Sequence, residues 1–103
     1  MKNLKSIEEF EGLKNGERVL FVFSADWCGD CRFLDPILPI IQEKYTAYQF
    51  IKVDRDEFID LCVDMDIYGI PSFVAFEKGV ELGRFVSKER KTQQEIEAFI
   101  DSL

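Results

Sequence analysis

Histidine is absent from this chain of 103 residues, and cysteine occurs only three times. A structural zinc site needs four ligands, which are mostly Cys and His side chains. Cys28 and Cys31 could supply two of them, but the only other cysteine is the distant Cys62. We therefore expect no bound metal, and the Cys28-x-x-Cys31 pair calls for another explanation.

Long apolar runs are missing as well. The longest uninterrupted run, residues 19–23, is far shorter than the ~20 residues that cross a bilayer. Residues 1–5 are not followed by the apolar block of a secretory signal peptide. We expect no contact with a membrane and a cytoplasmic location; a mature chain whose signal peptide has been removed is the alternative.

Basic residues are outnumbered, with 13 Lys and Arg against 20 Asp and Glu, which gives a net charge of −7. This balance argues against nucleic acid as a partner, because no basic stripe is available to neutralise phosphates. Six aspartates lie near the cysteine pair or precede the Pro71 segment. They either form an ordinary solvated surface or an acidic collar that favours cationic disulfide substrates. These residues are Asp26, Asp30, Asp35, Asp60, Asp64 and Asp66.

Apolar residues make up 47% of the chain and include ten phenylalanines, which is enough for one hydrophobic core. We expect a single domain, residues 1–103, and a monomer. Lone cysteines are usually buried, so Cys62 is interpreted as a core residue rather than a regulatory thiol.

The periodicity of apolar residues predicts alternating strands and helices. Ser6 and Glu9 begin a short helix with Ile7, Phe10 and Leu13 facing inward, and Thr92 begins the last helix. Between them we expect strands at 18–24, 48–54, 72–76 and 80–86, and helices at 28–45 and 56–64. Residues 2–4 are the only candidates for a first edge strand. Pro36 should kink the 28–45 helix, and Pro39 should add a second kink or a tightened turn.

Three landmarks occur in order: Trp27-Cys28-Gly29-Asp30-Cys31, then Pro36, then Gly69-Ile70-Pro71-Ser72. Together they resemble the thioredoxin family, whose usual active-site motif is Trp-Cys-Gly-Pro-Cys. The resemblance extends from about Val19 to the C-terminus. It implies an α/β thioredoxin fold with a mixed four- to five-stranded sheet and helices on both faces, in agreement with the predicted elements.

The position of the two cysteines predicts their roles. A thiolate is the reactive form in disulfide exchange, and a helix N-terminus favours an anion there. Cys28 stands at that end and is the expected nucleophile, while Cys31, one turn further, is the resolving thiol. Their reversible disulfide is the only redox group required, so no other cofactor is expected.

Other residues should shape the site. Gly29 keeps the path of attack open, and Trp27 offers a rigid apolar flank to a substrate. The resemblance implies that the Ile70–Pro71 bond is cis, that Pro71 faces the cysteines, and that the backbone of Ile70 pairs with an extended substrate segment.

Four positions depart from the family pattern. Asp30 replaces the proline between the cysteines and brings a negative charge close to Cys28. Val22 and Phe50 stand where family members carry a buried aspartate and its lysine partner, so the internal base for Cys31 is missing. Ser24 replaces a tryptophan and leaves more room beneath the site.

The predicted function is reduction of protein disulfides by thiol–disulfide exchange. Partners would be disulfide-containing proteins as substrates, with a thioredoxin-reductase-type flavoprotein or a low-molecular-weight thiol as electron donor. One alternative is a thioredoxin-like binding module or specialised redox partner with weak general activity. An oxidase or isomerase would need an oxidising compartment, to which the N-terminus gives no support, and a strongly stabilised thiolate, which Asp30 does not favour.

Overall fold

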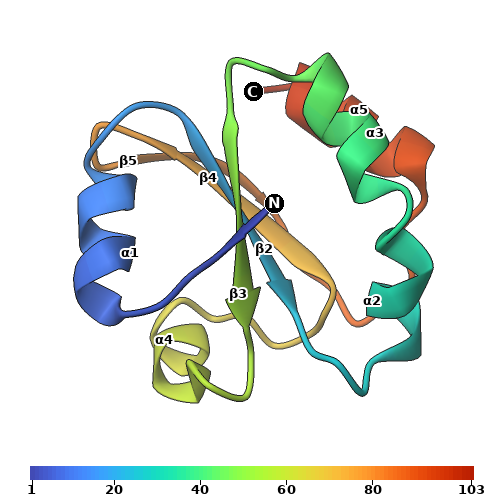
Figure 1. The fold of residues 1–103 in the computed structure, drawn as a ribbon, viewed down its shortest axis with the longest axis horizontal. Helices are drawn as coiled ribbons and strands as arrows, with labels where there is room; N and C mark the ends of the chain where they lie inside the picture. The colour runs from blue at the N-terminus through green and yellow to red at the C-terminus, as the bar shows by residue number, and fades with distance from the viewer.

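The computed structural model describes residues 1–103 and contains one five-stranded sheet between two layers of helices (Figure 1). The strand order is β1-β3-β2-β4-β5, with β1, β3 and β2 parallel to one another and β4 antiparallel to both β2 and β5. The elements in chain order are β1 (Lys2–Asn3), α1 (Ile7–Lys14), β2 (Val19–Ser24), α2 (Gly29–Leu34), α3 (Leu38–Lys44), β3 (Gln49–Asp54), α4 (Ile59–Asp64), β4 (Ser72–Glu77), β5 (Val80–Phe85) and α5 (Gln93–Asp101).

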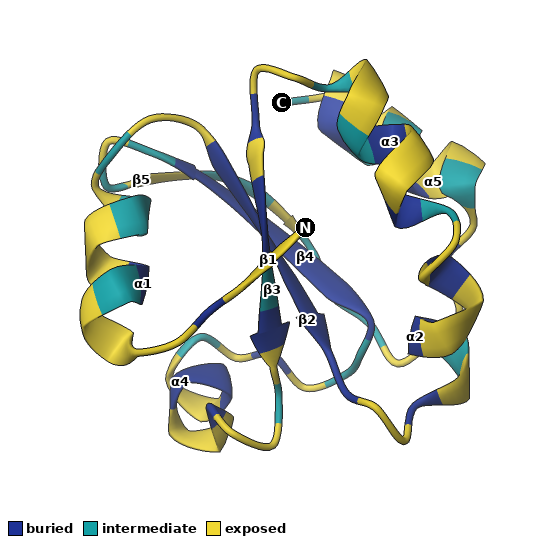
Figure 2. Cartoon of the chain, viewed as in Figure 1, coloured by how far each residue is buried: buried dark blue, intermediate teal, exposed yellow.

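The central strand β2 is buried at all six positions, as its continuous run of apolar residues predicts (Figure 2). Alternate side chains of a strand point to opposite faces, so β2 contributes to two separate cores. Phe21 and Phe23 belong to the core with α1 and α4, whereas Leu20 and Val22 belong to the core with α2, α3 and α5. The two helical layers are visible on either side of the sheet in Figure 1.

The predicted helix at 28–45 is wrong in one respect, because it is two helices rather than one kinked helix. α2 ends at Leu34 and α3 begins at Leu38, with Pro36 in the turn between them. Pro39 lies in the first turn of α3, where backbone N–H groups have no partner within the helix. The chain therefore has five helices instead of the four predicted, and Pro39 lies in the first turn of a helix instead of kinking one.

The remaining elements agree closely with the predictions. Ser6 and Thr92 cap α1 and α5, and the reciprocal capping box is complete at Thr92 and Glu95. Residues 2–3 form the short edge strand β1. Ile7 is an error, because 49% of its surface is exposed and only Phe10 is fully buried on α1. No helix is both long enough and apolar enough to span a bilayer.

The sheet brings the two predicted halves of the site together. Cys28 follows the carboxyl end of β2, and Pro71 precedes the amino end of β4. Since β2 and β4 are antiparallel, with Phe23 opposite Ser72, these two ends lie at the same edge of the sheet. Segments more than 40 residues apart in the sequence therefore meet at one place.

Candidate functional site

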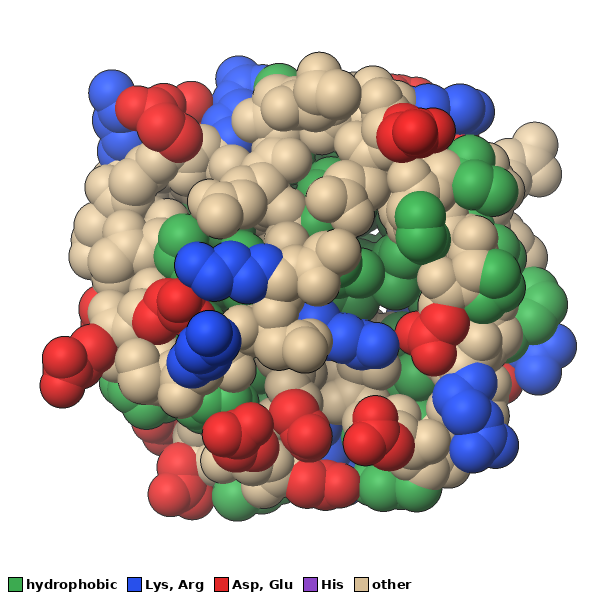
Figure 3. Space-filling model, in the orientation of Figure 1, with side chains coloured by type: hydrophobic (Ala, Val, Ile, Leu, Met, Phe, Trp, Pro, Cys, Tyr) green, Lys and Arg blue, Asp and Glu red, His purple; other side chains and the backbone are tan.

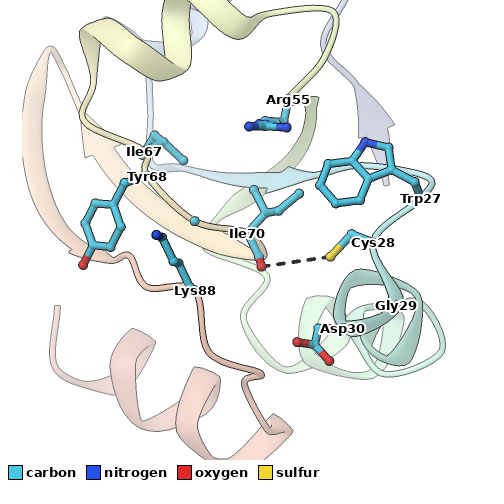
Figure 4. A pocket seen from close by; sticks show the side chains of 10 residues that line it. Trp27, Cys28, Gly29, Asp30, Arg55, Ile67, Tyr68, Ile70 and Lys88 are labelled. Carbon is cyan, nitrogen blue, oxygen red and sulfur yellow. Dashed lines mark hydrogen bonds between the residues drawn. The ribbon is translucent and has the colours of Figure 1, made fainter.

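The two cysteines lie at the start of α2. Cys28 is the N-cap of this helix, and its sulfur accepts a hydrogen bond from the backbone N–H of Cys31 at 3.2 Å. This contact uses the sulfur as the side-chain cap of α2 and fixes its position at the start of the helix. The same sulfur lies 4.0 Å from the carbonyl oxygen of Ile70 (Figure 4).

Cys31 is in a different environment. Only 2% of its surface is exposed, and burial, followed by a hydrogen bond with Cys28, raises the pKa of the Cys31 thiol to about 11. A hydrogen bond with Ser24 acts in the opposite direction and lowers the pKa of Cys31. Cys31 is therefore a protonated thiol at neutral pH, while 7% of the surface of the neighbouring Cys28 is exposed.

A groove of about 430 Å³ opens above Cys28 (Figure 4). Trp27 forms one wall with 59% of its surface exposed, and its indole N–H donates to an Asp56 carboxylate oxygen at 2.7 Å. The groove gives an external sulfur access to Cys28 but not to Cys31. Its lining consists of Trp27, Cys28, Gly29, Asp30, Arg55, Ile67, Tyr68, Gly69, Ile70 and Lys88.

The opposite wall is the segment before β4. The Ile70–Pro71 peptide bond is cis, as the family resemblance implies. The Ser72 hydroxyl donates to the Gly69 carbonyl at 2.6 Å and closes the turn around this bond. The Ile70 carbonyl faces the Cys28 sulfur, and the pairing of the Ile70 backbone with a substrate stays a prediction.

Asp30 does not present a free charge to Cys28, contrary to the assumption made from the sequence. Its carboxylate accepts a hydrogen bond from the Arg90 guanidinium at 2.9 Å. Arg90 also lies over the ring of Phe33, 4.5 Å from the ring centroid. The pair partly cancels the negative charge beside the thiol. Asp35 is likewise paired, with Lys52 at 3.2 Å.

The other departures from the family pattern have a structural basis. Val22 and Phe50 are both fully buried in the core with α2, α3 and α5, where neither can accept a proton. Ser24 lines a second cavity of about 270 Å³, together with Lys52 and Asp54, and the lining of this cavity is mostly polar.

Several site residues were missed by the sequence analysis. Arg55 and Lys88 line the groove, and Arg90 contacts it through Asp30. The signal available was the cluster Lys88-Glu89-Arg90-Lys91, an unusual concentration of basic residues in an acidic chain. By contrast, the acidic side chains between residues 54 and 64 gather around α4 (Figure 3).

Cys62 lies outside the site, and no metal-binding group is found. Cys62 is buried in the core with α1 and α4, and burial raises the pKa of its thiol to about 11. The structure contains no group of three or more Cys, Asp or Glu side chains arranged to hold a metal ion.

Known proteins share this sequence and this fold. A sequence model of the family described as Thioredoxin matches residues 4–102. Mitochondrial thioredoxin-2 of Schizosaccharomyces pombe is 34% identical over 96 residues, which cover 89% of this chain and 72% of that protein. Thioredoxin of Bos taurus is 32% identical over 106 residues, which cover 100% of this chain and 98% of that protein.

The crystal structure of oxidised mitochondrial thioredoxin 3 from Saccharomyces cerevisiae superimposes with a TM-score of 0.85 at 26% identity. The match covers 100% of this chain and 95% of that chain. The predicted α/β fold, a mixed sheet with helices on both faces, is confirmed by this agreement.

Proposed function

Since the chain belongs to the thioredoxin family and is a thiol–disulfide oxidoreductase that reduces protein disulfides, we propose that Cys28 and Cys31 carry out its reaction. The observation that supports this assignment is the asymmetry of the pair. Cys28 lines the groove and its sulfur accepts the Cys31 N–H at 3.2 Å, whereas Cys31 does not line the groove and its thiol has a pKa of about 11. The Cys28 sulfur is placed to attack an external disulfide, and the Cys31 thiol reacts only in the second step.

The reaction has two steps. The Cys28 thiolate attacks one sulfur of a substrate disulfide, forming a mixed disulfide and releasing the other sulfur as a thiolate that takes a proton from water. Cys31 then loses its proton and attacks Cys28, which releases the second substrate thiol and forms the Cys28–Cys31 disulfide. Two electrons have passed from the chain to the substrate, and a thioredoxin-reductase-type flavoprotein or a low-molecular-weight thiol must supply two more to reduce the Cys28–Cys31 disulfide.

The second step is the slower one in this proposal. Cys31 must lose its proton, and Val22 provides no carboxylate to accept it. The Asp30 carboxylate is already paired with Arg90 at 2.9 Å. The hydroxyl of Ser24, which hydrogen-bonds to Cys31 and lines the polar second cavity, offers the route to water.

The biological setting is also part of the proposal. A Cys-x-x-Cys pair that must cycle through the reduced form suits a reducing compartment, so we place the chain in the cytoplasm. Electrons would come from a thioredoxin-reductase-type flavoprotein or a low-molecular-weight thiol. The chain would act as a monomer on proteins that carry a disulfide.

Insulin reduction with dithiothreitol tests the proposal. Cys28→Ser should abolish turnover, and Cys31→Ser should accumulate a mixed disulfide that non-reducing mass spectrometry detects. Cys62→Ala, a change at the third buried thiol, is the matched control and should keep wild-type turnover. A wild-type chain that binds substrate but turns over nothing would instead be a binding module, and a fully active Cys31→Ser variant would overturn the assigned roles.

A further inference from the structure

The groove contains one charge without a partner. Three charged side chains line it: Asp30, Arg55 and Lys88. Asp30 is paired with Arg90 at 2.9 Å, and Arg55 with Asp56 at 3.5 Å. Lys88 makes no ion pair or hydrogen bond through its side chain, so the groove of this acidic chain presents an uncompensated positive charge.

The loop that carries Lys88 is held in place from within. Lys91 has only 1% of its surface exposed, and its ammonium group donates to the carbonyls of Ser87 at 2.8 Å and Glu89 at 2.7 Å. These two carbonyls flank Lys88 on either side. A buried ammonium group is costly unless its hydrogen bonds are made, so Lys91 and the loop fix one another.

The same loop is packed against both halves of the site. A Cβ atom on Gly69 would lie 2.4 Å from the Ser87 carbonyl oxygen and 2.7 Å from the Lys88 nitrogen, so the loop and the groove wall are in direct backbone contact. The Tyr68 hydroxyl donates to the Val86 carbonyl at 3.0 Å. On the other side, Arg90 contacts α2 through Asp30.

These contacts direct Lys88 into the groove. Figure 4 shows its ammonium group between Tyr68 and Ile70, in the groove that also contains Cys28. A carboxylate on the substrate would therefore meet a cation that has no competing partner.

We propose that Lys88 is a specificity-determining residue that selects disulfide substrates with a carboxylate close to the half-cystine attacked by Cys28. This inference rests on the proposed function of Cys28. It reverses the acidic-collar interpretation of the sequence, which favoured cationic substrates. The carboxylate belongs either to an acidic protein segment or to a small disulfide with carboxylate groups, and both present the same chemistry to Lys88.

Single-turnover kinetics test the proposal without an electron donor. The pre-reduced full chain is mixed with synthetic peptide disulfides in which the residues flanking the half-cystine are all Glu, all Gln or all Lys. At low ionic strength the wild-type rate constants should rank Glu above Gln above Lys. Each step should be about two- to fivefold, the range expected of an exposed ion pair, and the ranking should weaken in ~0.5 M salt.

Variants assign the preference to one residue. Lys88→Gln should remove the ranking, and Lys88→Glu should invert it. Lys78→Gln is the matched control, because Lys78 is an exposed, unpaired lysine in the β4–β5 turn at the other end of the sheet. A second series with dithiodipropionate, hydroxyethyl disulfide and cystamine distinguishes the sources: a ranking among peptides only indicates an acidic protein segment, and a ranking among the small disulfides indicates a low-molecular-weight substrate.

Equal rates for the Glu and Lys peptides with the wild-type chain, or an unchanged ranking in Lys88→Glu, would overturn the inference while leaving the reductase intact. Failure of the wild-type chain to reduce even the Gln peptide would instead refute the proposed function. The two failures are therefore distinguishable in one experiment.

Discussion

Returning the family's carboxylate to the core, with Val22→Asp, should make stability strongly dependent on pH. Val22 is fully buried among Leu34, Phe50 and Phe73, and none of these side chains can donate a hydrogen bond. A charged carboxylate in such surroundings costs several kcal/mol, so the group stays protonated in the folded protein. In the unfolded chain the same group ionises with a pKa of about 3.9.

The size of the effect follows from this difference. Because burial raises the pKa of the folded state, the variant is most stable at low pH and loses stability as the pH rises. The loss is about 1.4 kcal/mol for every pH unit above ~4, as long as the buried carboxyl remains protonated. Burying the neutral acid adds about 1–3 kcal/mol that does not depend on pH. Near neutral pH the sum is a large part of the 5–15 kcal/mol that typically stabilises a domain.

Urea unfolding at pH 5.5 and 6.5 measures the difference. The wild-type chain and Val22→Asn, which cannot ionise, serve as references at each pH. Relative to Val22→Asn, Val22→Asp should lose about 1.4 kcal/mol more at pH 6.5 than at pH 5.5. If the free energies of unfolding of Val22→Asp and Val22→Asn differ by the same amount at pH 5.5 and pH 6.5, a cation must reach the carboxylate. Lys52, which is opposite Val22 on β3 and paired with Asp35, is the residue that would do so.

Three further outcomes are expected. Gly69→Ala should lower the free energy of unfolding by about 1–3 kcal/mol, because the new methyl group meets loop backbone at 2.4 Å, whereas Gly12→Ala in α1 has open space and should raise it by about 0.5–1 kcal/mol. Arg90→Gln leaves the negative charge of Asp30 unpaired beside Cys28. Alkylation of Cys28 by iodoacetamide should then be about two- to fivefold slower. With a pKa of about 11 caused by burial, Cys62 should resist alkylation in the native protein at pH 8.

Each of these predictions can be refuted by one result. Chemical unfolding that finds Gly69→Ala as stable as wild type would mean that the 86–92 loop is free to move. The Asp30→Asn/Arg90→Gln double variant should alkylate at the wild-type rate, because it carries no charge at position 30. A rate that stays slow would show that Arg90 does not act through the charge of Asp30. Peptide mapping that finds labelled Cys62 without urea would place this thiol outside the core.

The sequence was sufficient for those features that depend on local patterns. The short apolar runs located the strands, the helical periodicity located most helices, and Ser6 and Thr92 predicted the starts of the first and last helices. The break between α2 and α3 was missed because Pro36 and Pro39 have the same local effect, and only the packing of α3 decides which of them ends a helix.

The ion pairs and the free charge of the site could not be predicted from local sequence patterns. The pairing of Asp30 with Arg90 joins residues 60 positions apart, and the placement of Lys88 depends on the backbone contact at Gly69. Ion pairs between distant segments leave no periodic signal in the sequence. The thiols themselves were predictable because three positions separate them on one helix.

The loop at residues 86–92 lies outside the elements that position the thiols, since Cys28 and Cys31 are set by β2 and α2 alone. Its own order comes mainly from Lys91 and the Gly69 contact. Substitutions at Lys88 should thus change which substrates the reductase prefers while the geometry of the two thiols is kept, whereas substitutions at Arg90 also affect the charge of Asp30 beside Cys28. Exchanging this one segment between related chains is a direct way to engineer new substrate preferences.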